Sequence, residues 1–506
     1  MSIIINSIAL QGLEAEKITV EADMLNELPN LVIVGLPDAA VQEAKERVKL
    51  AIRNSGFEFP RKRIIVNLAP ADIRKEGPAF DLPIALAILV ATNQINQEIS
   101  DSIFIGELSL NGDLRSTAGV LPATIFAKNS GFKKIYIPAQ NCHEATLVEG
   151  IDIYPIKNMS KLVGHLQKEK IIEPIDRKLL NNQFNITTQF EVDMSFVKGQ
   201  EQAKRALEIA AAGGHNIIMS GPPGSGKTLL ARTLPSIMPE LTNEEILEVT
   251  KIYSVAGLLA TETPIINTRP FRSPHHTSSG VALVGGGKYP KPGEITLAHR
   301  GILFLDEFPE FPRQVLENLR QPLEDGVISI SRAQGTLTFP ARFILVASQN
   351  PCPCGYSSDQ EKNCTCTPSQ IIKYQKKISG PILDRIDLHI EVPRLKMEKL
   401  TADEEEECSA DIRQRVLQAR ERQAKRFKGT KILTNSEMRP QEIKSFCPLD
   451  ENSMQLLKSA TQKLNLSARS FHRIIKMSRT IADLNQEENI GSHHVAEAIQ
   501  YRQKDS

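Results

Sequence analysis

The pattern with the clearest chemical meaning is a glycine-rich loop between an apolar strand and a helix. The loop reads GPPGSGKT, over residues 221–228, and the apolar stretch 217–219 leads into it. Its glycines let backbone N–H groups turn toward phosphate groups at a helix N-terminus. Lys227 would reach the β and γ phosphates of ATP, and Thr228 would hold Mg²⁺. The residues predicted to bind the nucleotide are Gly221, Pro222, Pro223, Gly224, Ser225, Gly226, Lys227 and Thr228.

Two further strands end on polar side chains that suit phosphate chemistry. GILFLDEF carries Asp306 and Glu307 after four apolar residues, and RFILVASQN ends on Asn350. Ligands of open parallel sheets bind at the carboxyl ends of the strands. We therefore expect Asp306 to support Mg²⁺, Glu307 to polarise the attacking water and Asn350 to place an amide near the γ-phosphate.

Charge and hydropathy narrow the class of protein. The chain has 506 residues and a net charge of +1, so any binding of nucleic acid must come from local patches or from charges multiplied by oligomerisation. The longest apolar run, PIALAILVA from residue 83, is far shorter than the roughly 18–20 residues that span a bilayer. No signal-peptide pattern opens the sequence. We expect a soluble, cytoplasmic protein with no membrane partner.

Four of the seven cysteines stand in two Cys-x-Cys pairs within CPCGYSSDQEKNCTC. Clustered cysteines of a cytoplasmic protein favour metal binding over disulfides. Four thiolates complete a tetrahedral Zn²⁺ site, and the short polar segment between the pairs has no core of its own to order it. We predict a structural zinc held by Cys352, Cys354, Cys364 and Cys366. A redox pair or disulfides, and unliganded thiols, are the alternatives.

Alternating strand-like and helix-like stretches predict an α/β protein with several parts. Residues 1–170 form a domain of their own, and 171–195 are polar and lack a sustained period, which indicates a linker. Residues 196–395 form a second α/β region that contains the nucleotide motifs and the cysteine excursion at 352–366. Residues 396–506 are expected to be helical.

Within the first domain, period and composition predict individual elements. Val41, Ala44, Val48 and Ile52 would line one face of a helix that stops at Gly56. The Asn-Gly pair in LSLNGDLR predicts a hairpin. The expected strands are 31–36, 63–70, 103–110 and 133–138.

The order of these motifs resembles an AAA+ ATPase of the magnesium-chelatase type. RPFRSPHHTSSGVALVGGGKYPKPGEITLAHRGILFLDE and RQPLEDGVISISRAQGTLTFPARFILVASQNPCPCG are similar to the ComM/YifB group of competence-associated proteins. The resemblance covers nearly the whole chain. It implies a P-loop AAA+ core with a helix-2 insert and a pre-sensor-1 hairpin, followed by a C-terminal helical lid.

The resemblance also assigns two arginines. Arg385, in LDRID, falls where related ATPases carry an arginine finger that acts on the nucleotide of the neighbouring subunit. Arg469, in SARS, falls at the sensor-2 position of the lid, and Arg473 is a rival for that role. A finger that acts in trans implies a closed ring, which family analogy makes a homo-hexamer. The alternative for each arginine is an ordinary surface ion pair.

Two segments are the expected DNA-contacting elements. Residues 271–294 resemble the helix-2 insertion, and 326–343 resemble the hairpin that ring helicases project into their channel. Six copies of Lys288 and Arg332 would form a basic collar. The alternative is that both segments are solvated loops at a subunit interface. For His275 and His276 we expect packing within the insert or at an interface, since no cysteine or acid lies near them in the sequence.

The first domain resembles a Lon-protease-like domain. At the expected serine position KEGPAFDLPIA has Ala79, and Ala123 falls at the position of the partner lysine. A methyl group can neither attack a carbonyl nor accept a proton. The resemblance therefore implies a protease-dead α+β scaffold.

Together these features predict an ATP-driven DNA motor. As in the ComM family, it would act as a helicase in branch migration during homologous recombination and natural transformation, on single-stranded or branched DNA and alongside recombination proteins. The alternatives are a chelatase-type motor and a protein-remodelling motor, neither of which acts on DNA.

Overall fold

The computed structural model describes two compact units. Its described residues are 3–96, 99–176, 190–260, 263–287, 291–332, 335–359, 361–395, 406–464 and 466–502. Unit 1 comprises residues 1–187, 242–267 and 331–337, and unit 2 comprises 188–241, 268–330 and 338–506. Much of the predicted linker, residues 177–189, lies outside the described residues. No described helix is long and apolar enough to cross a membrane.

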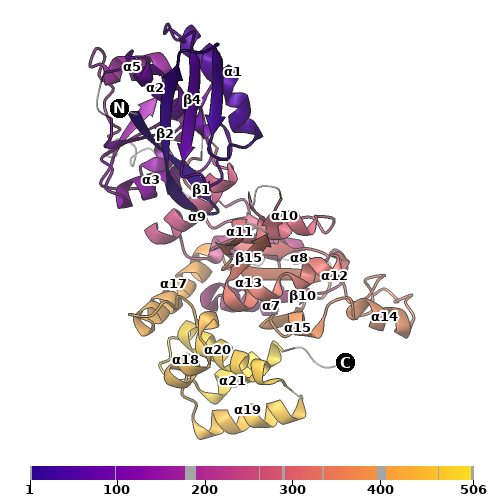
Figure 1. The fold of residues 1–506 in the computed structure, drawn as a ribbon. Coiled ribbons are helices and arrows are strands. Elements are labelled where there is room, and N and C mark those ends of the chain that lie inside the picture. The colour runs from indigo at the N-terminus through magenta and orange to yellow at the C-terminus, as the bar shows by residue number, and fades with distance from the viewer. Residues whose placement is uncertain are drawn as a thin grey trace. The chain divides into compact units, whose positions relative to one another are not determined.

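Unit 1 is built on a seven-stranded mixed sheet with the order β3-β4-β2-β1-β5-β8-β9 (Figure 1). β1 and β2 pair antiparallel, whereas β5, β8 and β9 run parallel. The strands are β1 (Ile3–Gln11), β2 (Glu14–Leu25), β3 (Asn30–Val34), β4 (Arg63–Ala69), β5 (Ser102–Phe104), β8 (Lys134–Pro138) and β9 (Asp152–Ile156).

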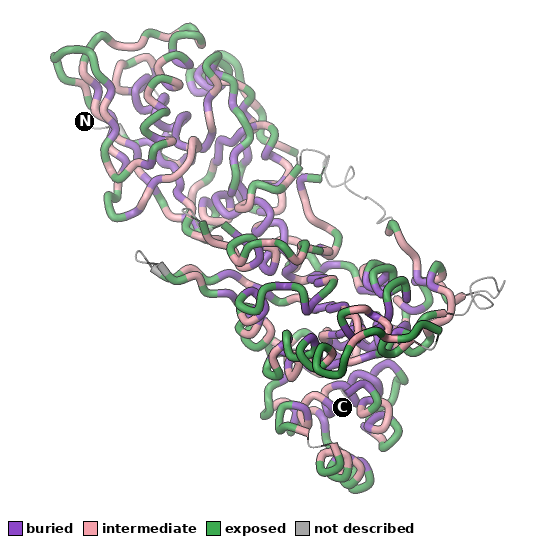
Figure 2. The backbone as a smooth tube through the Cα atoms, turned by 90° about the vertical axis from the view of Figure 1, so that its right-hand side faces the viewer, coloured by how far each residue is buried: buried purple, intermediate pink, exposed green. Residues whose placement is uncertain are grey.

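The helices of unit 1 pack against this sheet, except α9, which packs on α3. They are α1 (Ala39–Asn54), α2 (Asp81–Ala91), α3 (Val120–Asn129), α4 (Cys142–Ala145), α5 (Met159–Leu166) and α9 (Asn243–Ala256). The apolar run from residue 83 forms most of α2, which is buried along nearly its whole length (Figure 2). This explains why it is hydrophobic all round.

The predicted helix face of α1 is confirmed: Val41, Ala44, Val48 and Ile52 are all buried. A side-chain oxygen of Asp38 accepts a hydrogen bond from the Val41 N–H at 2.8 Å and caps the N-terminus. The expected strand 103–110 is interrupted, in contrast, because the chain leaves the sheet after Phe104. Its second half pairs as β6 (Glu107–Leu108) with β7 (Leu114–Arg115), so the predicted hairpin forms around a five-residue loop.

Helix α9 joins unit 1 although its sequence lies between the nucleotide motifs. It packs on α3, and its Ser254 hydroxyl donates a hydrogen bond to the Glu144 carboxylate. Glu144 also accepts from Asn141 at 2.7 Å and from the Leu121 N–H at 3.1 Å. Burial raises the pKa of Glu144, and these three donors oppose the rise. The carboxyl group therefore depends on α9 for part of its stabilisation.

Unit 2 contains a five-stranded parallel sheet with the order β11-β14-β17-β10-β18. The strands are β10 (Ile217–Ser220), β11 (Phe271–Arg272), β14 (Ile302–Leu305), β17 (Ile344–Gln349) and β18 (Leu388–Glu391). β14 and the first five residues of β17 are fully buried, as expected for central strands covered on both faces. The α/β class predicted for this part is confirmed.

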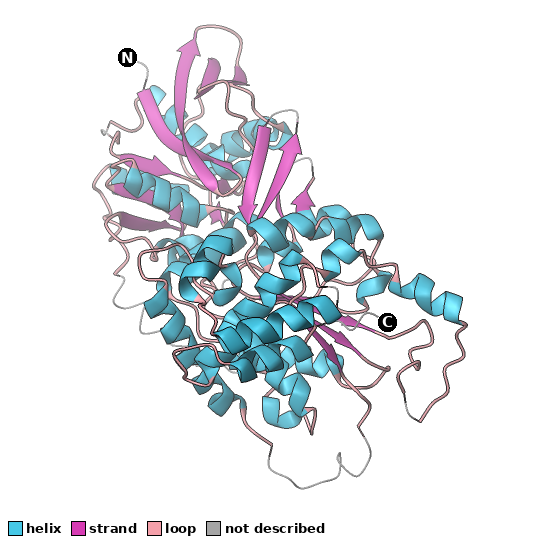
Figure 3. Cartoon of the chain, turned by 90° about the horizontal axis from the view of Figure 1, so that it is seen from below, coloured by secondary structure: helices cyan, strands magenta, loops and turns pink. Residues whose placement is uncertain are grey.

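Helices surround this sheet and continue to the C-terminus (Figure 3). The longer ones are α7 (Glu201–Gly213), α8 (Lys227–Ile237), α14 (Pro368–Gln375), α17 (Ser409–Arg426), α18 (Pro440–Phe446), α19 (Glu451–Lys463), α20 (Ala468–Leu484) and α21 (Ser492–Gln500). One hydrophobic core includes side chains of α7, α8, the sheet and the C-terminal helices. The C-terminal helices are therefore anchored to the sheet and to α7 and α8 by shared packing. A two-stranded hairpin, β15 (Val327–Arg332) and β16 (Gly335–Pro340), precedes β17.

A buried charge cluster holds the C-terminal helices together. The Asp483 carboxylate is fully buried and accepts from Arg426 and from Asn435, at 2.8 and 2.9 Å. Arg479, one turn earlier on α20, lies 3.1 Å from the same carboxylate. A carboxylate with three such partners tolerates burial because its charge is compensated.

Replacing Asp483 by Ala is expected to destabilise unit 2 by about 3–5 kcal/mol, because two guanidinium groups lose their buried counter-ion. Urea unfolding followed by circular dichroism measures the shift. Glu421→Ala, at an exposed position of α17, is the control and should change the transition by at most about 0.5 kcal/mol. A shift of that size for Asp483→Ala would contradict the assigned role.

Candidate nucleotide site and cysteine cluster

The glycine-rich loop connects β10 to α8 and surrounds the Lys227 ammonium group. Lys227 Nζ donates to the carbonyl oxygens of Gly221 at 2.7 Å and Pro222 at 2.9 Å. Burial lowers the pKa of Lys227, and the nearby Asp306 carboxylate opposes this. Gly221 admits no side chain, since a Cβ there would lie 2.2 Å from the Val392 carbonyl oxygen.

Thr228 and Asp306 meet as expected for a shared Mg²⁺ site. Thr228 Oγ1 donates to Asp306 Oδ2 at 3.0 Å. The Ser348 hydroxyl donates to the other oxygen of the same carboxylate. Hydroxyl and carboxylate oxygens are the ligands that Mg²⁺ prefers, so the pair suits the ion that accompanies ATP. Ser348 was missed from the sequence, although it lies in the last two residues of β17, directly before Gln349 and Asn350 end the predicted motif.

Asn350 follows β17 and reaches the lysine of the loop. Its Oδ1 lies 3.4 Å from Lys227 Nζ. β10 and β17 are adjacent and parallel, with Ser220 opposite Gln349, so their carboxyl ends lie together. The structure thus brings Lys227, Thr228, Asp306 and Asn350 to one edge of the sheet.

Glu307 has an unusual backbone conformation and a partner from segment 271–294. Its φ is +51°, a left-handed conformation that costs a non-glycine residue about 1–3 kcal/mol. A Glu307 carboxylate oxygen lies 3.2 Å from Nδ1 of His276. The His276 ring also lies against the His275 ring, with ring centroids 4.1 Å apart and the ring planes tilted by 34°. Segment 271–294 thus contacts the candidate catalytic carboxylate. The expectation that His276 only packs was incomplete, because Glu307 lies 31 residues away in sequence.

We expect His276→Ala to lower kcat for ATP hydrolysis about tenfold and to leave KM unchanged, because Glu307 loses the ring that fixes its carboxylate. Steady-state hydrolysis measures both constants. His276→Gln, which keeps a polar partner, should retain most of the rate, and His275→Ala should stay near the wild-type value. A higher KM with an unchanged kcat would instead place His276 in nucleotide binding.

Arg385 and Arg469 share one partner, which was not foreseen. Arg385 forms an ion pair with Glu324, and Arg469 Nη2 donates to the same carboxylate at 3.0 Å. Arg385 is 8% exposed and also donates to the Pro381 carbonyl at 2.7 Å. The hydrogen bond from Arg385, with a further contribution from Arg469, lowers the pKa of Glu324. The rival Arg473 lies 3.2 Å from Asp387 instead.

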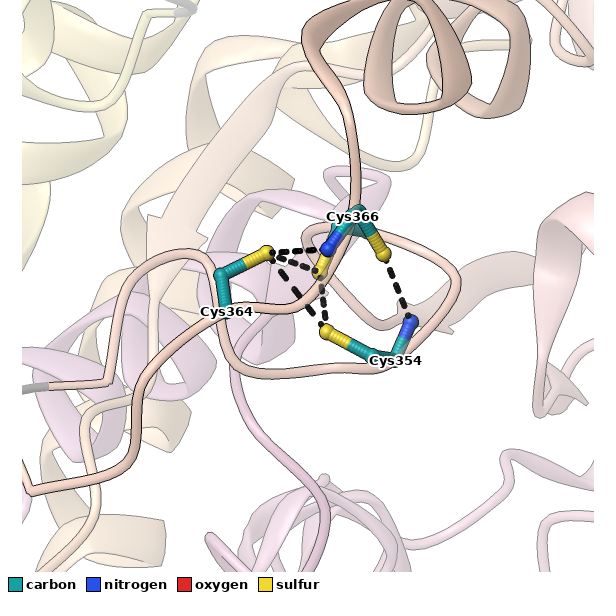
Figure 4. Close-up of side chains that lie close together, drawn as sticks. Cys354, Cys364 and Cys366 are labelled. Atoms are coloured by element: carbon teal, nitrogen blue, oxygen red, sulfur yellow. Dashed lines mark hydrogen bonds between the residues drawn. The ribbon is translucent and has the colours of Figure 1, made fainter.

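The four clustered cysteines lie together after β17 (Figure 4). Cys352 Sγ lies 3.4 Å from Cys354 Sγ and 3.7 Å from Cys364 Sγ, and the last two sulfurs are 3.5 Å apart. The four sulfurs, including that of Cys366, all lie within 4.8 Å of one another. A tetrahedral zinc with Zn–S bonds of about 2.3 Å places its sulfurs about 3.8 Å apart. The cluster therefore has the size of a zinc site, and all four residues are free thiols.

Backbone groups already stabilise thiolates in this cluster. The N–H groups of Tyr356 and Thr365 lower the pKa of Cys354 to about 5. The Cys366 N–H favours the Cys364 thiolate too, but burial and the adjacent sulfurs raise the pKa of Cys364 to about 12. Ionisation of one thiol therefore disfavours ionisation of the neighbouring thiols. A divalent cation among the sulfurs removes that repulsion and lets all four ionise.

A second cluster, made of Glu487, His493 and His494, does not fit a metal. The three residues offer ligand atoms within 4.8 Å of one another. However, His494 Nδ1 accepts a hydrogen bond from the Gly491 N–H at 2.9 Å. In a neutral His494 ring the proton is then on Nε2, the ring nitrogen that faces Glu487. A protonated Nε2 has no lone pair to bind a metal.

The residues aligned with a protease dyad lie in unit 1. Ala123 is buried in α3, and Ala79 packs against the same small core. Lys75 is fully buried, and its ammonium group donates to the Pro70 carbonyl. For the predicted DNA contacts, Lys288 and the side chain of Arg332 lie outside the described residues.

The loop, the Thr–Asp pair and the asparagine at adjacent strand ends have the arrangement expected of a P-loop nucleotide site. Three family models match the chain: "Magnesium chelatase, subunit ChlI" over residues 193–400, "Subunit ChlI of Mg-chelatase" over 20–141, and the C-terminal part of that subunit over 406–502. The protein therefore falls in the magnesium-chelatase-like class, a group of AAA+ ATPases.

Similar proteins place the chain more narrowly. It is 44% identical to "Competence protein ComM" of Haemophilus influenzae over 503 residues, which are 99% of this chain and 97% of that one. It is 42% identical to YifB of Escherichia coli, over 99% of this chain and 96% of the relative. A magnesium-chelatase subunit ChlI of Euglena gracilis is 23% identical over 57% of this chain and 76% of its own. The chain belongs to the ComM/YifB family of magnesium-chelatase-like proteins.

Proposed function

We propose that this chain is the subunit of an ATP-driven ring that moves DNA, as a helicase in branch migration during recombination and natural transformation. The observation that carries the proposal is the contact between His276 and Glu307, at 3.2 Å. His276 belongs to the insert that we expect to contact DNA, and Glu307 is the candidate catalytic residue. A ligand on the insert would therefore change the hydrolytic site. The full-length similarity to a competence protein supports the same process.

Each residue of the site has a separate role in binding or hydrolysing ATP. Loop N–H groups and Lys227 bind the phosphates, while Thr228 and Asp306 hold Mg²⁺. The bound ion neutralises phosphate charge. Glu307 orients the attacking water, and Asn350 fixes the γ-phosphate. Placing these groups before the reaction is the main contribution a protein makes to phosphoryl transfer.

The two arginines, the four cysteines and the first domain also have roles in the proposed ring. Arg385 and Arg469 act at the nucleotide of a homo-hexamer, Arg385 from the neighbouring subunit and Arg469 as sensor 2 of the helical lid. The four cysteines hold a structural Zn²⁺. The Lon-like first domain, with Ala79 and Ala123, is a protease-dead scaffold that docks partners such as recombination proteins. The ring works in the cytoplasm, where its DNA is found.

ATP hydrolysis measured with no DNA, with single-stranded DNA and with a four-way junction tests the proposal, with Lys227→Ala as the blank. We expect strong stimulation by DNA, greatest with the junction. A rate that is the same in all three would overturn the DNA motor. The same assay with a porphyrin or with an unfolded protein identifies the other functions.

The descriptions of the family models favour one second candidate. All three name the magnesium-chelatase subunit ChlI, so a motor that drives metal insertion is the alternative. Stimulation of hydrolysis by a porphyrin, and not by DNA, would support it. Stimulation by unfolded protein alone would support a remodelling motor.

A further inference from the structure

The segment that holds the four cysteines approaches the phosphate-binding loop at Gly355. The chain turns sharply after Asn350, and the Gly355 N–H donates to the Cys352 carbonyl oxygen at 3.0 Å. This turn places Gly355 against Pro223. A Cβ built at Gly355 would lie 2.6 Å from Pro223 Cδ and 2.8 Å from Cγ. Because both atoms belong to a rigid ring, no side chain fits there.

Two short chains of contacts connect this turn to Lys227. Cys354 is bonded to Gly355, which packs on Pro223, and Pro223 follows the Pro222 carbonyl that binds Lys227 Nζ at 2.9 Å. On the other route, Cys352 lies two residues after Asn350, whose side chain lies 3.4 Å from Lys227 Nζ. Cys352 is fully buried, so its sulfur has little freedom to move independently of the turn.

The segment between the two cysteine pairs offers little packing of its own. The clusters of buried hydrophobic residues include no described residue of 355–366. Order in this segment therefore depends on what joins the sulfurs. If the sulfurs separate, we expect the turn from Cys352 to Gly355 to open and Gly355 to move away from Pro223.

We propose that metal in the four-cysteine site controls nucleotide binding, by holding Gly355 against Pro223 and Asn350 beside Lys227. This rests on the proposed ATP site and goes beyond a purely structural zinc. Because coupling between two ligands is reciprocal, bound nucleotide must also raise the affinity of the site for the metal, by the same factor. Gly355 is a positioning residue that acts through the loop.

The test uses the full chain loaded with Zn²⁺ and measures two affinities: that for a fluorescent ADP analogue, and that for zinc in equilibrium competition with a coloured chelator. We expect Gly355→Ala to keep one zinc per chain and to bind the analogue about tenfold more weakly, a typical allosteric coupling. Gly429→Ala is the matched control. Gly429 has a φ of +86°, close to the +87° of Gly355, but no neighbour within 4 Å of an added Cβ. It should therefore share the backbone strain without the loss of affinity.

Two further measurements make the outcome decisive. Cys364→Ser should lose both the zinc and a similar factor in nucleotide affinity, and saturating ADP should raise the zinc affinity of the wild type by that factor. If Gly355→Ala does not fold, Pro223→Ala replaces it and is expected to bind zinc more weakly. Wild-type affinity for the analogue in Gly355→Ala, a zinc affinity indifferent to ADP, or a wild-type chain that binds no zinc would each overturn the proposal. Failure of the ATP site itself appears differently, as no binding of the analogue by the wild type.

Discussion

Lys227→Ala is expected to lower ATP hydrolysis about 10²–10³-fold, the cost of removing one preorganised donor from a charge-stabilising site. The ammonium group is nearly buried and bonds to two loop carbonyls. Alanine removes both these bonds and the positive charge beside Asn350. Binding of the fluorescent ADP analogue should weaken as well, because the phosphates lose their cation.

The control is Lys425→Ala, an exposed position of α17. It should hydrolyse ATP at the wild-type rate. Circular dichroism should show that both variants are folded. A Lys227→Ala chain that keeps the wild-type rate would show that this loop is not the hydrolytic site.

Arg385→Ala lowers hydrolysis about 10³–10⁵-fold if this arginine stabilises the transferred phosphoryl group. Within its own chain, Arg385 is bonded to Glu324 and Pro381. To reach a neighbouring nucleotide it must leave Glu324, whose carboxylate keeps Arg469 as a partner. Binding of the ADP analogue to isolated subunits should therefore change little.

Mixing two inactive variants distinguishes action in trans from a local defect. Arg385→Ala subunits keep an intact loop, and Lys227→Ala subunits keep an intact arginine. Their mixture should recover part of the rate at interfaces that combine the two. A mixture of Lys227→Ala with Asp306→Asn should recover none, because both changes damage the same side of the interface. No recovery in the first mixture would contradict a finger acting in trans.

Contiguous motifs explain why much of the nucleotide site was predictable. Residues 221–228 form one loop, and Asp306 and Asn350 each end a strand whose apolar run is visible in the sequence. Parallel pairing then brings these ends together without further information. The cysteine cluster was predictable for the same reason, since all four sulfurs belong to one short segment.

Contacts between distant residues were not predictable. Glu324 lies 61 residues before Arg385 and 145 before Arg469, and no periodicity links such positions. The His276–Glu307 pair was missed likewise, and so was the contact of Gly355 with Pro223, which requires the approach of two loops. The break of strand 103–110 was missed because its apolar composition continues although the chain leaves the sheet after Phe104.

The position of α9 has a consequence for how this protein can be divided or inherited. A fragment that ends near residue 187 would have the whole seven-stranded sheet but would lack Ser254, the hydroxyl donor to buried Glu144. The face of α3 that α9 covers would also become exposed, because apolar side chains such as Leu247 would be missing. Residues 1–187 therefore cannot be exchanged between proteins as an independent domain. Recombination between genes of this family at the linker yields a foldable product only if both partners also agree in residues 242–267, some 55 positions downstream of the join.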